Sequence, residues 1–508
     1  MIIWETLIVF LIYFIVSMVA VGIYTQRKFI KKGIDFTIAS RTLPWWLIAS
    51  GILLIPFGIG NSLLIAESSW IYGSSILWWM VVGSALTCVV ALIGPGRWFR
   101  RVEAESYPDA LAKIFKDERM RIIGIMTSYM WVFGIATLEL FGCAAALYGL
   151  TGLDLTYCVL IGFLLYFLYI IFGGMFQYTY LNILNVIVIY ICIGLTFFGL
   201  SMWIAPIGGW EGATTLIAEK MGTWATTMLP LERLGEMFLA LWIPILVAHT
   251  AAVAFTGPVP LVTHGMKSER EAIKGWPMAL LLNGYWGWLW VMLGMLALVV
   301  PASLYGPMAP AIEALRAAPG VTGAVPAAII TAISTGTISS TAVLIALMAA
   351  TISTGSACAL YIASSTTTDI VKRYLNPNIS ERKFIWLVRI VAIGIMAAAI
   401  WGALLRGYLL GGFLWIFSSA MPVLIYVPLA FFWRRNTNAA IATTIINFII
   451  LYIWLIFYPA LSPMMPSWMQ ALGFTYPSFI VSLILYPVLA LALPGGKPGY
   501  LKEEKQEV

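Results

Sequence analysis

Charged residues and histidines are scarce in this chain of 508 residues. Asp, Glu, Lys and Arg together make up 10% of it, there are two His, and 61% of the residues are hydrophobic. A soluble protein has roughly 25% charged and about 45–50% apolar residues. Because one soluble core cannot hide so large an apolar excess, the composition excludes an ordinary soluble domain and indicates lipid as solvent. The two His leave little material for a metal centre or a catalytic triad, so an integral-membrane enzyme is the weaker alternative.

The sequence also lacks a GxxxxGK[ST] phosphate loop. Its longest predicted loop, 97–120, has no room for an ATP-hydrolysing module, so uphill transport by such a chain would have to use an ion gradient. The five cysteines all fall in apolar segments without a close pair or metal-ligand spacing. We therefore expect them to be small apolar core residues.

Long apolar segments are abundant. A helix needs about 20 apolar residues to cross the hydrocarbon, and the sequence predicts about thirteen such spans, an all-α integral membrane protein. The predicted spans are 4–26, 44–66, 74–96, 121–150, 154–173, 177–204, 235–256, 275–302, 339–370, 384–405, 409–433, 437–458 and 475–494. Residues 311–317 and 325–336 are expected to form short helices in an outer loop.

The positions of Lys and Arg predict the orientation. Most of the 29 Lys and Arg residues fall in alternate loops, which the positive-inside rule assigns to the cytoplasm. This places the N-terminus outside, the C-terminal tail in the cytoplasm and the protein in the plasma membrane. The net charge of +7 then needs no nucleic-acid partner. The first span lacks a basic start and a cleavage site, so we expect a retained helix rather than a signal peptide.

Two segments hint at internal symmetry. Residues 53–61 read LLIPFGIGN and residues 241–249 read LWIPILVAH, each inside an apolar span. Proline removes a backbone hydrogen-bond donor, so a carbonyl of the preceding turn loses its partner. At bilayer depth such carbonyls are tolerated only where they line a cavity or bind a ligand. We expect paired helix breaks at Pro56 and Pro244, of the kind seen in inverted-repeat transporters. Chance similarity, or a simple kink at Pro244, is the alternative.

Hydroxyl side chains gather in the span that includes Ser353, Thr354 and Ser356. Hydroxyls in a membrane helix often bond back to their own helix or mark helix packing. A sodium ion, however, prefers about five or six oxygen ligands and no nitrogen. Hydroxyls here, facing unwound carbonyls at 54–58, would provide them.

Several motifs resemble one family. Ser40 to Trp46 (SRTLPWW) is similar to its GRSLPWW entry, Gly173-Gly174-Met175 to its GGM, and Lys267 to Ala272 (KSEREA) to its KSEKEA. The segments Ser106-Tyr107-Pro108-Asp109 and Ala346 to Ile370 also match in order and spacing. Over residues 6–436 the chain thus resembles the sodium:solute symporter family.

The resemblance implies a LeuT-like inverted-repeat fold with a 5+5 core and a broken first core helix. The divisions are a leading helix (4–26), two core repeats (44–204 and 235–433), two trailing helices (437–494) and a cytoplasmic tail (495–508). It further implies a sodium ion bound between the first and eighth core helices. Its ligands would be the carbonyls of Leu54, Phe57 and Ala350 and the hydroxyls of Ser353 and Thr354.

The chain departs from the family pattern at the solute pocket. Pro56 and Gly60 stand where members often have Asn, Asp or Glu, and Leu261-Val262 stand where Gln-Arg is usual. We therefore expect a pocket unlike that of the sugar carriers.

Three polar residues are the candidates for binding the solute. Asn61 closes the first predicted break, and Glu139 and His249 lie deep in spans, where ionisable groups usually face the bundle interior. The alternative for Glu139 is a structural role as the partner of a backbone group. The alternatives for His249 are a core histidine and a proton carrier. The cluster of Trp70, Tyr72, Trp78 and Trp79 fits an interfacial belt better than a gate.

The predicted function is symport of sodium with a small organic solute by alternating access. Exposed half-helix N-termini favour an organic acid or amino acid. The alternatives are a proton-coupled or uncoupled carrier on the same fold, a channel, or a transporter-like sensor. The expected functional unit is a monomer in the lipid bilayer.

Overall fold

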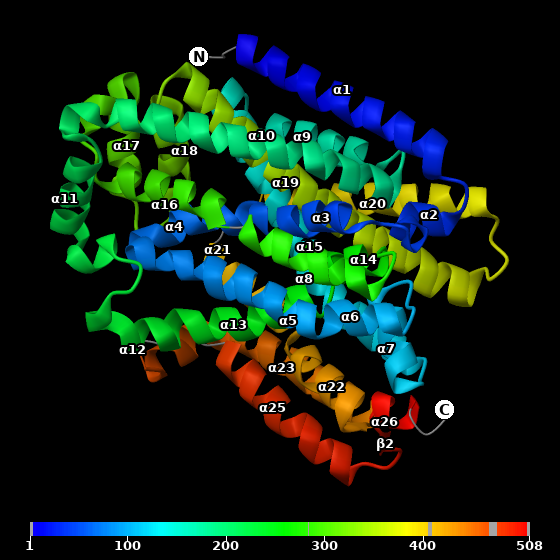
Figure 1. The fold of residues 1–508 in the computed structure, drawn as a ribbon. Coiled ribbons are helices and arrows are strands. Elements are labelled where there is room, and N and C mark those ends of the chain that lie inside the picture. The colour runs from blue at the N-terminus through cyan, green and yellow to red at the C-terminus, as the bar shows by residue number, and fades with distance from the viewer. Residues whose placement is uncertain (1–3, 283, 405–408, 467–474, 505–508) are drawn as a thin grey trace.

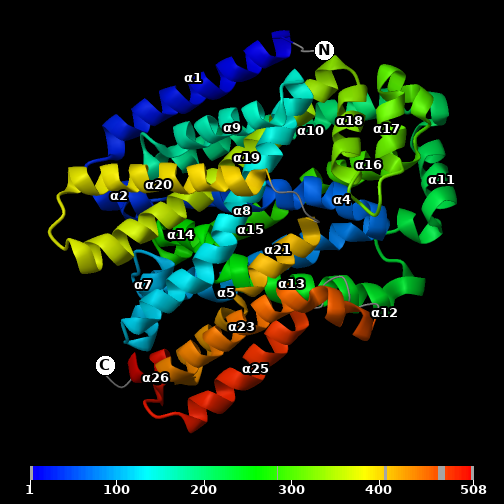
Figure 2. The same ribbon diagram turned by 180° about the vertical axis from the view of Figure 1, so that it is seen from behind.

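Helix α19 (Thr337–Ser365) runs through the centre of the molecule (Figures 1 and 2). The computed structural model describes residues 4–282, 284–404, 409–466 and 475–504. The stretch Thr337–Leu375 begins with α19, and 94% of its 18 most apolar consecutive residues are buried inside the protein. The corresponding share in α1 (Trp4–Phe29) is 28%. Helices α8 (Arg119–Thr151) and α10 (Gly174–Trp203) pack along α19. No hydrophobic driving force acts between helices in a membrane, so their association depends on close packing. The small residues of α19 permit that close packing.

Long apolar helices account for most of the chain. Within the described residues, 11 helices are long and apolar enough to cross a membrane, and a bent pair raises this number to 12. The predicted span 154–173 corresponds to the shorter helix α9 (Leu155–Ile170). The all-helical membrane fold is therefore confirmed, while the count of thirteen stays a prediction.

Most predicted bounds lie within a few residues of the observed helices. Residue 405, the end of one predicted span, lies outside the described residues. The observed helices of the second half are α15 (Glu269–Leu281), α16 (Gly284–Val299), α17 (Ala309–Arg316), α18 (Ala324–Ser334), α20 (Glu381–Ala403), α21 (Leu409–Ser418), α22 (Met421–Phe432), α23 (Thr437–Leu461) and α25 (Thr475–Ala492). Other short helices are α2 (Gly33–Ile38), α5 (Thr87–Ile93), α6 (Pro95–Arg101), α7 (Tyr107–Phe115), α11 (Gly209–Met221), α12 (Leu234–Met237), α13 (Ile243–His249), α14 (Pro258–His264) and α26 (Tyr500–Glu504).

The first predicted break is present, but it lies two residues later than expected. Helix α3 (Trp45–Phe57) continues through Pro56, and the backbone leaves the helical region at Gly58, where ψ is −150°. A short 3₁₀ turn leads to α4 (Leu63–Tyr72), and the two apolar segments are bent by 64°. Pro56 removes a donor near the end of α3, and the glycine that follows permits the departure from the helix.

The second predicted break, at Pro244, is wrong. A π-helical turn at Phe238–Trp242 precedes the proline, which stands in the first turn of α13, and the backbone stays helical to Phe255. The π-helical turn just before Pro244 changes the backbone hydrogen-bond pattern there, so the missing N–H of the proline is accommodated without a break. The chain instead leaves the helix just before α14, at Gly257, where φ is 77°.

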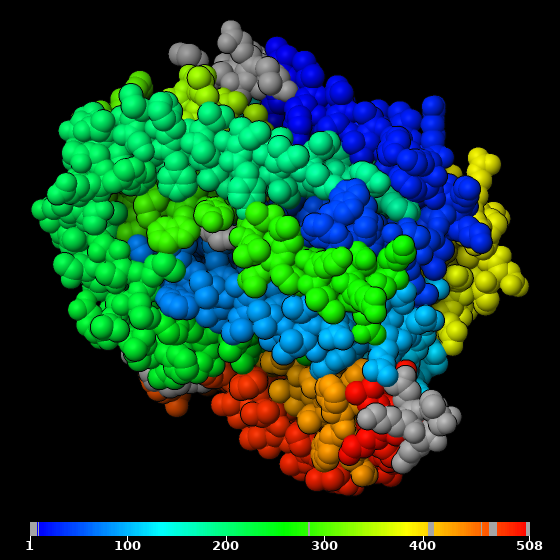
Figure 3. All heavy atoms as spheres, in the orientation of Figure 1, coloured from blue at the N-terminus to red at the C-terminus, as the bar shows by residue number. Residues whose placement is uncertain are grey.

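The leading and trailing helices lie on opposite sides of the molecule. Figure 3 shows residues of α1 at the upper edge and those of α23 and α25 at the lower edge. Large apolar side chains are exposed along these helices, for example Ile12, Val16, Ile453, Ile456 and Ile484. Such faces suit lipid contact, because the hydrocarbon accepts apolar side chains on the outside of a protein.

One end of the molecule holds α6, α7, α14 and the C-terminal segment, and we call it the basic end (right in Figure 1). There the strands β1 (Arg434–Arg435) and β2 (Lys497–Pro498) pair antiparallel. The start of α3 also joins the end of α14, since Leu43 N–H donates to the Gly265 carbonyl at 2.9 Å. Residues 505–508 of the predicted tail lie outside the described residues.

Candidate functional site

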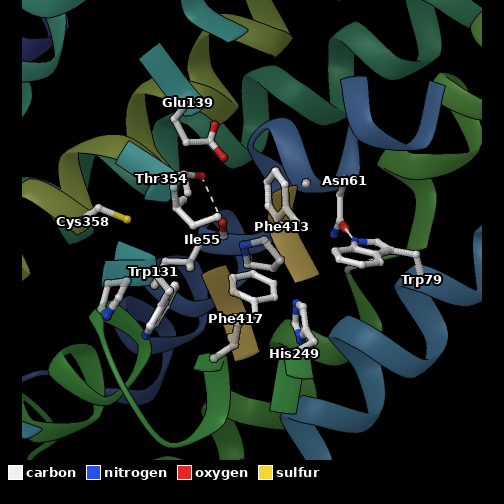
Figure 4. A pocket seen from close by; sticks show the side chains of 15 residues that line it. Ile55, Asn61, Trp79, Trp131, Glu139, His249, Thr354, Cys358, Phe413 and Phe417 are labelled. Atoms are coloured by element: carbon white, nitrogen blue, oxygen red, sulfur yellow. Dashed lines mark hydrogen bonds between the residues drawn. The ribbon is translucent and has the colours of Figure 1, made fainter. Parts of the chain in front are cut away.

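A buried cavity lies beside the first helix break (Figure 4). The three predicted solute residues, Asn61, Glu139 and His249, all line it, and so does Thr354 of the predicted sodium site. About 30 Å³ of the cavity is open to the centre of a water molecule, which is room for about two waters. The walls must therefore separate before a solute enters.

Glu139 of α8 binds the backbone at the break. Both of its carboxylate oxygens lie 2.9 Å from the Ile59 amide nitrogen, which donates to them. This amide is one of those that a helix start leaves without a partner. A Cβ at Gly58 would lie 2.2 Å from a Glu139 oxygen, so glycine is needed there to leave room for the carboxylate.

Asn61 connects the same break to the segment Trp79–Arg101. Its amide nitrogen donates to the Ser84 hydroxyl at 3.2 Å, and its amide oxygen accepts from the Trp79 indole at 3.0 Å. Asn61 therefore helps to fix the Trp79 ring in the cavity wall. The predicted belt position is wrong for Trp79, whose side chain is 1% exposed.

His249 lies beside Trp79 in the cavity wall. Its Nδ1 lies 3.0 Å from the Thr87 hydroxyl, which in turn lies 3.1 Å from the Thr250 hydroxyl. The imidazole ring is edge-on to Trp79 and to Phe417, with centroid distances of 5.6 and 5.4 Å. His249 is thus held by a hydroxyl pair, and its ring forms part of the wall (Figure 4).

The predicted sodium ligands meet where α3 ends against α19. The Thr354 hydroxyl lies 3.0 Å from the Leu54 carbonyl, 3.1 Å from that of Ile55 and 3.0 Å from that of Ala350. The Ser353 hydroxyl donates to the Ala350 carbonyl at 2.8 Å. These are neutral oxygens from two helices, with no nitrogen among them.

Phe57, the remaining predicted ligand, has a different partner. Its carbonyl accepts a hydrogen bond from the Trp286 indole at 2.7 Å, and the two rings are stacked. A carbonyl has two lone pairs, so this bond leaves one acceptor position. The Ile55 carbonyl beside Thr354 was not among the five named ligands, although it lies within the predicted carbonyl segment 54–58.

Four aromatic residues of the wall had no distinguishing pattern in the sequence. They are Trp79, Trp131, Phe413 and Phe417. Aromatic residues make up 14% of the chain, so four rings among many cannot be selected by type. Only the tertiary fold brings α8, α21 and the Trp79–Arg101 segment to one cavity.

Ion pairs connect three elements at the basic end. The buried Arg121 of α8 binds Asp109 of α7 at 2.9 Å and Asp369, beyond α19, at 2.5 Å. Burial opposes ionisation of Asp109, but nearby Lys113 and Arg121 outweigh it and lower the pKa of that carboxyl. Breaking one partner of such a buried network is strongly destabilising. The network therefore ties the helices together at the end opposite α11 and α17.

The chemistry of the cavity suits binding rather than bond-breaking. Within the described residues, no group of three His, Cys, Asp or Glu side chains is placed to hold a metal ion. Neutral hydroxyls and carbonyls instead match a hard monovalent cation. Aromatic walls with a few polar groups are typical of small-molecule sites.

Comparison with known proteins identifies the family of the chain. The model of the sodium:solute symporter family matches residues 36–447. The chain is 24% identical to a sodium/glucose cotransporter of Vibrio parahaemolyticus over 503 residues, covering 92% of this chain and 88% of that protein. It is 33% identical to a sodium/proline symporter of Haemophilus influenzae over 145 residues, which cover 27% of this chain and 28% of that protein.

A solved structure shares the fold. It is a Na⁺-coupled sialic acid symporter in a substrate-bound, outward-open state, and it superposes with a TM-score of 0.72 at 14% identity, over 94% of this chain and 97% of that one. The family expected from the sequence motifs is thereby confirmed. The chain belongs to the sodium:solute symporter family and is a sodium-coupled membrane transporter, not an enzyme.

Proposed function

We propose that this protein symports sodium and a small solute, with sodium held between α3 and α19 and the solute in the adjoining cavity. The sodium ligands are the carbonyls of Leu54, Phe57 and Ala350 and the hydroxyls of Ser353 and Thr354. Asn61 and His249 face the solute, and Glu139 supplies negative charge beside both.

The crowding of acceptors around Thr354 is the observation that supports the sodium site. One hydroxyl can donate one hydrogen, yet three carbonyl oxygens lie within 3.1 Å of it. At most one of these contacts is a full hydrogen bond, and the other oxygens repel one another. A sodium ion placed among them would remove that repulsion, because it binds several oxygens at once.

The position of Glu139 changes the argument about the solute. A half-helix N-terminus was expected to attract a carboxylate of the solute. In the structure the Ile59 amide at that position already donates to the Glu139 carboxylate. The expected preference for an acidic solute therefore loses its original support. Glu139 binds a backbone amide in addition to lining the cavity.

Coupling follows from the shared helix break. The sodium ligands Leu54 and Phe57 precede Gly58, and the cavity residues Gly60 and Asn61 follow it. An ion that fixes α3 against α19 also fixes the start of the next segment, which forms part of the solute wall. Each ligand then strengthens the other by the same factor, as linkage requires.

The proposal also specifies the orientation of the chain in the membrane and the number of chains in the functional unit. The basic end faces the cytoplasm in a plasma membrane, in accord with the positive-inside rule. The N-terminus is then outside, and one chain is the functional unit. Cysteine labelling of Lys502→Cys in intact cells tests the orientation, since a membrane-impermeant reagent should react only after the membrane is opened.

A sodium-dependent uptake and stability experiment tests the proposed function. Ser353→Ala with Thr354→Ala should abolish sodium-stimulated uptake in proteoliposomes and the rise in melting temperature on replacing KCl with NaCl. That rise reflects about 1.4 kcal/mol when the sodium concentration is ten times the Kd. Ser364→Ala is the matched control on the same helix, because the Ser364 hydroxyl has no hydrogen-bond partner among the described residues.

The outcomes separate sodium coupling from its alternatives. Unchanged sodium dependence in the double variant would refute the site. Uptake that is equal in NaCl and KCl but rises at low pH would show a proton-coupled carrier instead.

A further inference from the structure

Four rings of the cavity wall form a closed cycle of edge-to-face contacts, which we call the aromatic box: Trp79, Phe413, Phe417 and His249. Around the cycle, the centroid distances are 6.1, 5.6, 5.4 and 5.6 Å, and the planes of neighbouring rings meet at 83° to 90°. Figure 4 shows these rings grouped on one side of the cavity.

The spacing of the aromatic box fits a cation. A square with such sides has its centre about 4 Å from each ring centroid, which is within the roughly 6 Å over which a cation and an aromatic ring attract each other. Neighbouring walls at right angles are the arrangement of a box rather than of a stack. The present cavity has room for about two waters, so the rings must move outward before an alkylated ammonium group can enter.

A glycine permits the close approach of one wall. A Cβ at Gly60 would lie 3.2 Å from the Phe413 ring, which is tighter than most side-chain contacts. The Trp79 indole is fixed by its bond to the Asn61 amide oxygen. The box is thus positioned by side-chain and backbone contacts from several helices.

A carboxylate in the wall also favours a positively charged group within the cavity. Glu139 is 1% exposed and lines the cavity, while no Lys or Arg is among the described residues that line it. No ion pair to Glu139 occurs within the described part of the chain. An intramembrane carboxylate is costly without a positive partner, so a positively charged group nearby stabilises it.

Counting charges narrows the class of solute. One sodium ion and the Glu139 carboxylate already balance, so a solute with no net charge is favoured over a simple cation or anion. A zwitterion satisfies both conditions: its positive end fits the aromatic box, and its negative end can approach the bound sodium. Thr354 lines the same cavity as the box, which brings the two ends within one site.

We propose that the solute is a small zwitterion whose positive end is an N-methylated ammonium held in the aromatic box. This inference rests on the proposed sodium symport and names the substrate class of the same site. Methylated ammonium groups suit aromatic walls because their charge is spread over methyl groups and needs no hydrogen-bond acceptor.

Binding to purified protein tests the proposal with three probes. They are N,N,N-trimethylglycine, its carbon isostere 3,3-dimethylbutanoate, and choline. We expect N,N,N-trimethylglycine to bind in NaCl and to bind at least tenfold more weakly in KCl. The isostere has the same shape without the positive charge, so it should not bind measurably, and choline should bind more weakly than the zwitterion.

Variants of the box provide the structural test. Trp79→Leu and Phe417→Leu should each weaken N,N,N-trimethylglycine binding by about 30-fold, which corresponds to about 2 kcal/mol. Trp78→Phe is the matched control: Trp78 packs on Trp242 and donates to the Met228 carbonyl, and it does not line the cavity. Its binding should equal that of the unaltered protein.

Three results would overturn the inference: equal binding of the isostere, tighter binding of choline than of the zwitterion, or no binding of any methylated ammonium. In each case the rise in melting temperature with NaCl, measured without solute, tells the two proposals apart. If that rise persists and depends on Ser353 and Thr354, sodium symport stands and only the substrate class is wrong.

Discussion

The two helix breaks both contain a glycine, but glycine is required for different reasons. At Gly257 the backbone has a φ of 77°, a conformation that side chains with a Cβ rarely adopt. At Gly58 φ is −52°, and the requirement is space, because the Glu139 carboxylate occupies the position of a Cβ. The first break is therefore shaped by a charged group, and the second by backbone conformation.

The polar groups around the two breaks also differ. At the second break, the Thr256 hydroxyl donates to the Ala252 carbonyl at 2.8 Å and accepts from the Trp131 indole at 2.6 Å. Those bonds are local and use neutral partners. At the first break, a carboxylate and a crowded set of carbonyls face the cavity. This difference supports the proposal that ions bind at the first break, whereas the second break is a packed joint.

Gly257→Ala should have the largest effect. The alanine costs about 1–2 kcal/mol of backbone strain. In addition, its Cβ would lie 2.3 Å from the Trp131 ring. We expect little folded protein in a detergent-solubilised size-exclusion assay. Gly194→Ala is the control, since nothing lies within 4 Å of its Cβ position. Wild-type yield of Gly257→Ala would refute the conformational requirement.

Gly58→Ala should be nearly as harmful, but it should be relieved by a second change. Adding Glu139→Ala removes the clashing carboxylate, so the double variant should regain folded protein without regaining transport. Adding Trp131→Leu to Gly257→Ala should restore less, because the backbone strain remains. Equal recovery of yield in the two double variants would remove the distinction between the breaks.

Glu139→Gln should separate the charge of the first break from its hydrogen bond. The amide oxygen still accepts from the Ile59 N–H, so the melting temperature should change little. Loss of the negative charge beside sodium and solute should lower sodium-driven uptake by at least about tenfold, about 1.4 kcal/mol. Uptake at the normal rate would make Glu139 a structural residue only.

Trp286→Phe should have the smallest effect of this series. The ring remains stacked on Phe57, and only the hydrogen bond to the Phe57 carbonyl is lost, which is worth about 1 kcal/mol. The sodium concentration for half-maximal uptake should change by less than about tenfold. A complete loss of sodium dependence would mean that this bond is essential to the ion site.

The sequence predicted the elements better than their breaks. Apolar length was enough to place most of the long helices, because a helix needs about 20 apolar residues to cross the bilayer. Pro244 misled the prediction of the second break, since the π-helical turn before it accommodates the missing N–H without a break, whereas Gly257 leaves the helix thirteen residues later.

The candidate site was predicted in part for a similar reason. Asn61 was selected by its place at the first predicted break, and Glu139 and His249 were selected as rare ionisable residues in apolar spans. The structure places all three on one cavity. Phe413, Phe417 and Trp79 are common types in such a chain. Their proximity depends on tertiary packing that no local pattern specifies.

The most direct test of the sodium site is equilibrium binding of radioactive sodium to purified Thr354→Val. Valine keeps the shape of the side chain and removes the one oxygen that lies beside the Leu54, Ile55 and Ala350 carbonyls. The protein should remain folded and lose saturable sodium binding, while Ser364→Ala should keep it. Undiminished sodium binding by folded Thr354→Val would contradict the assignment of the ion to the contact between α3 and α19.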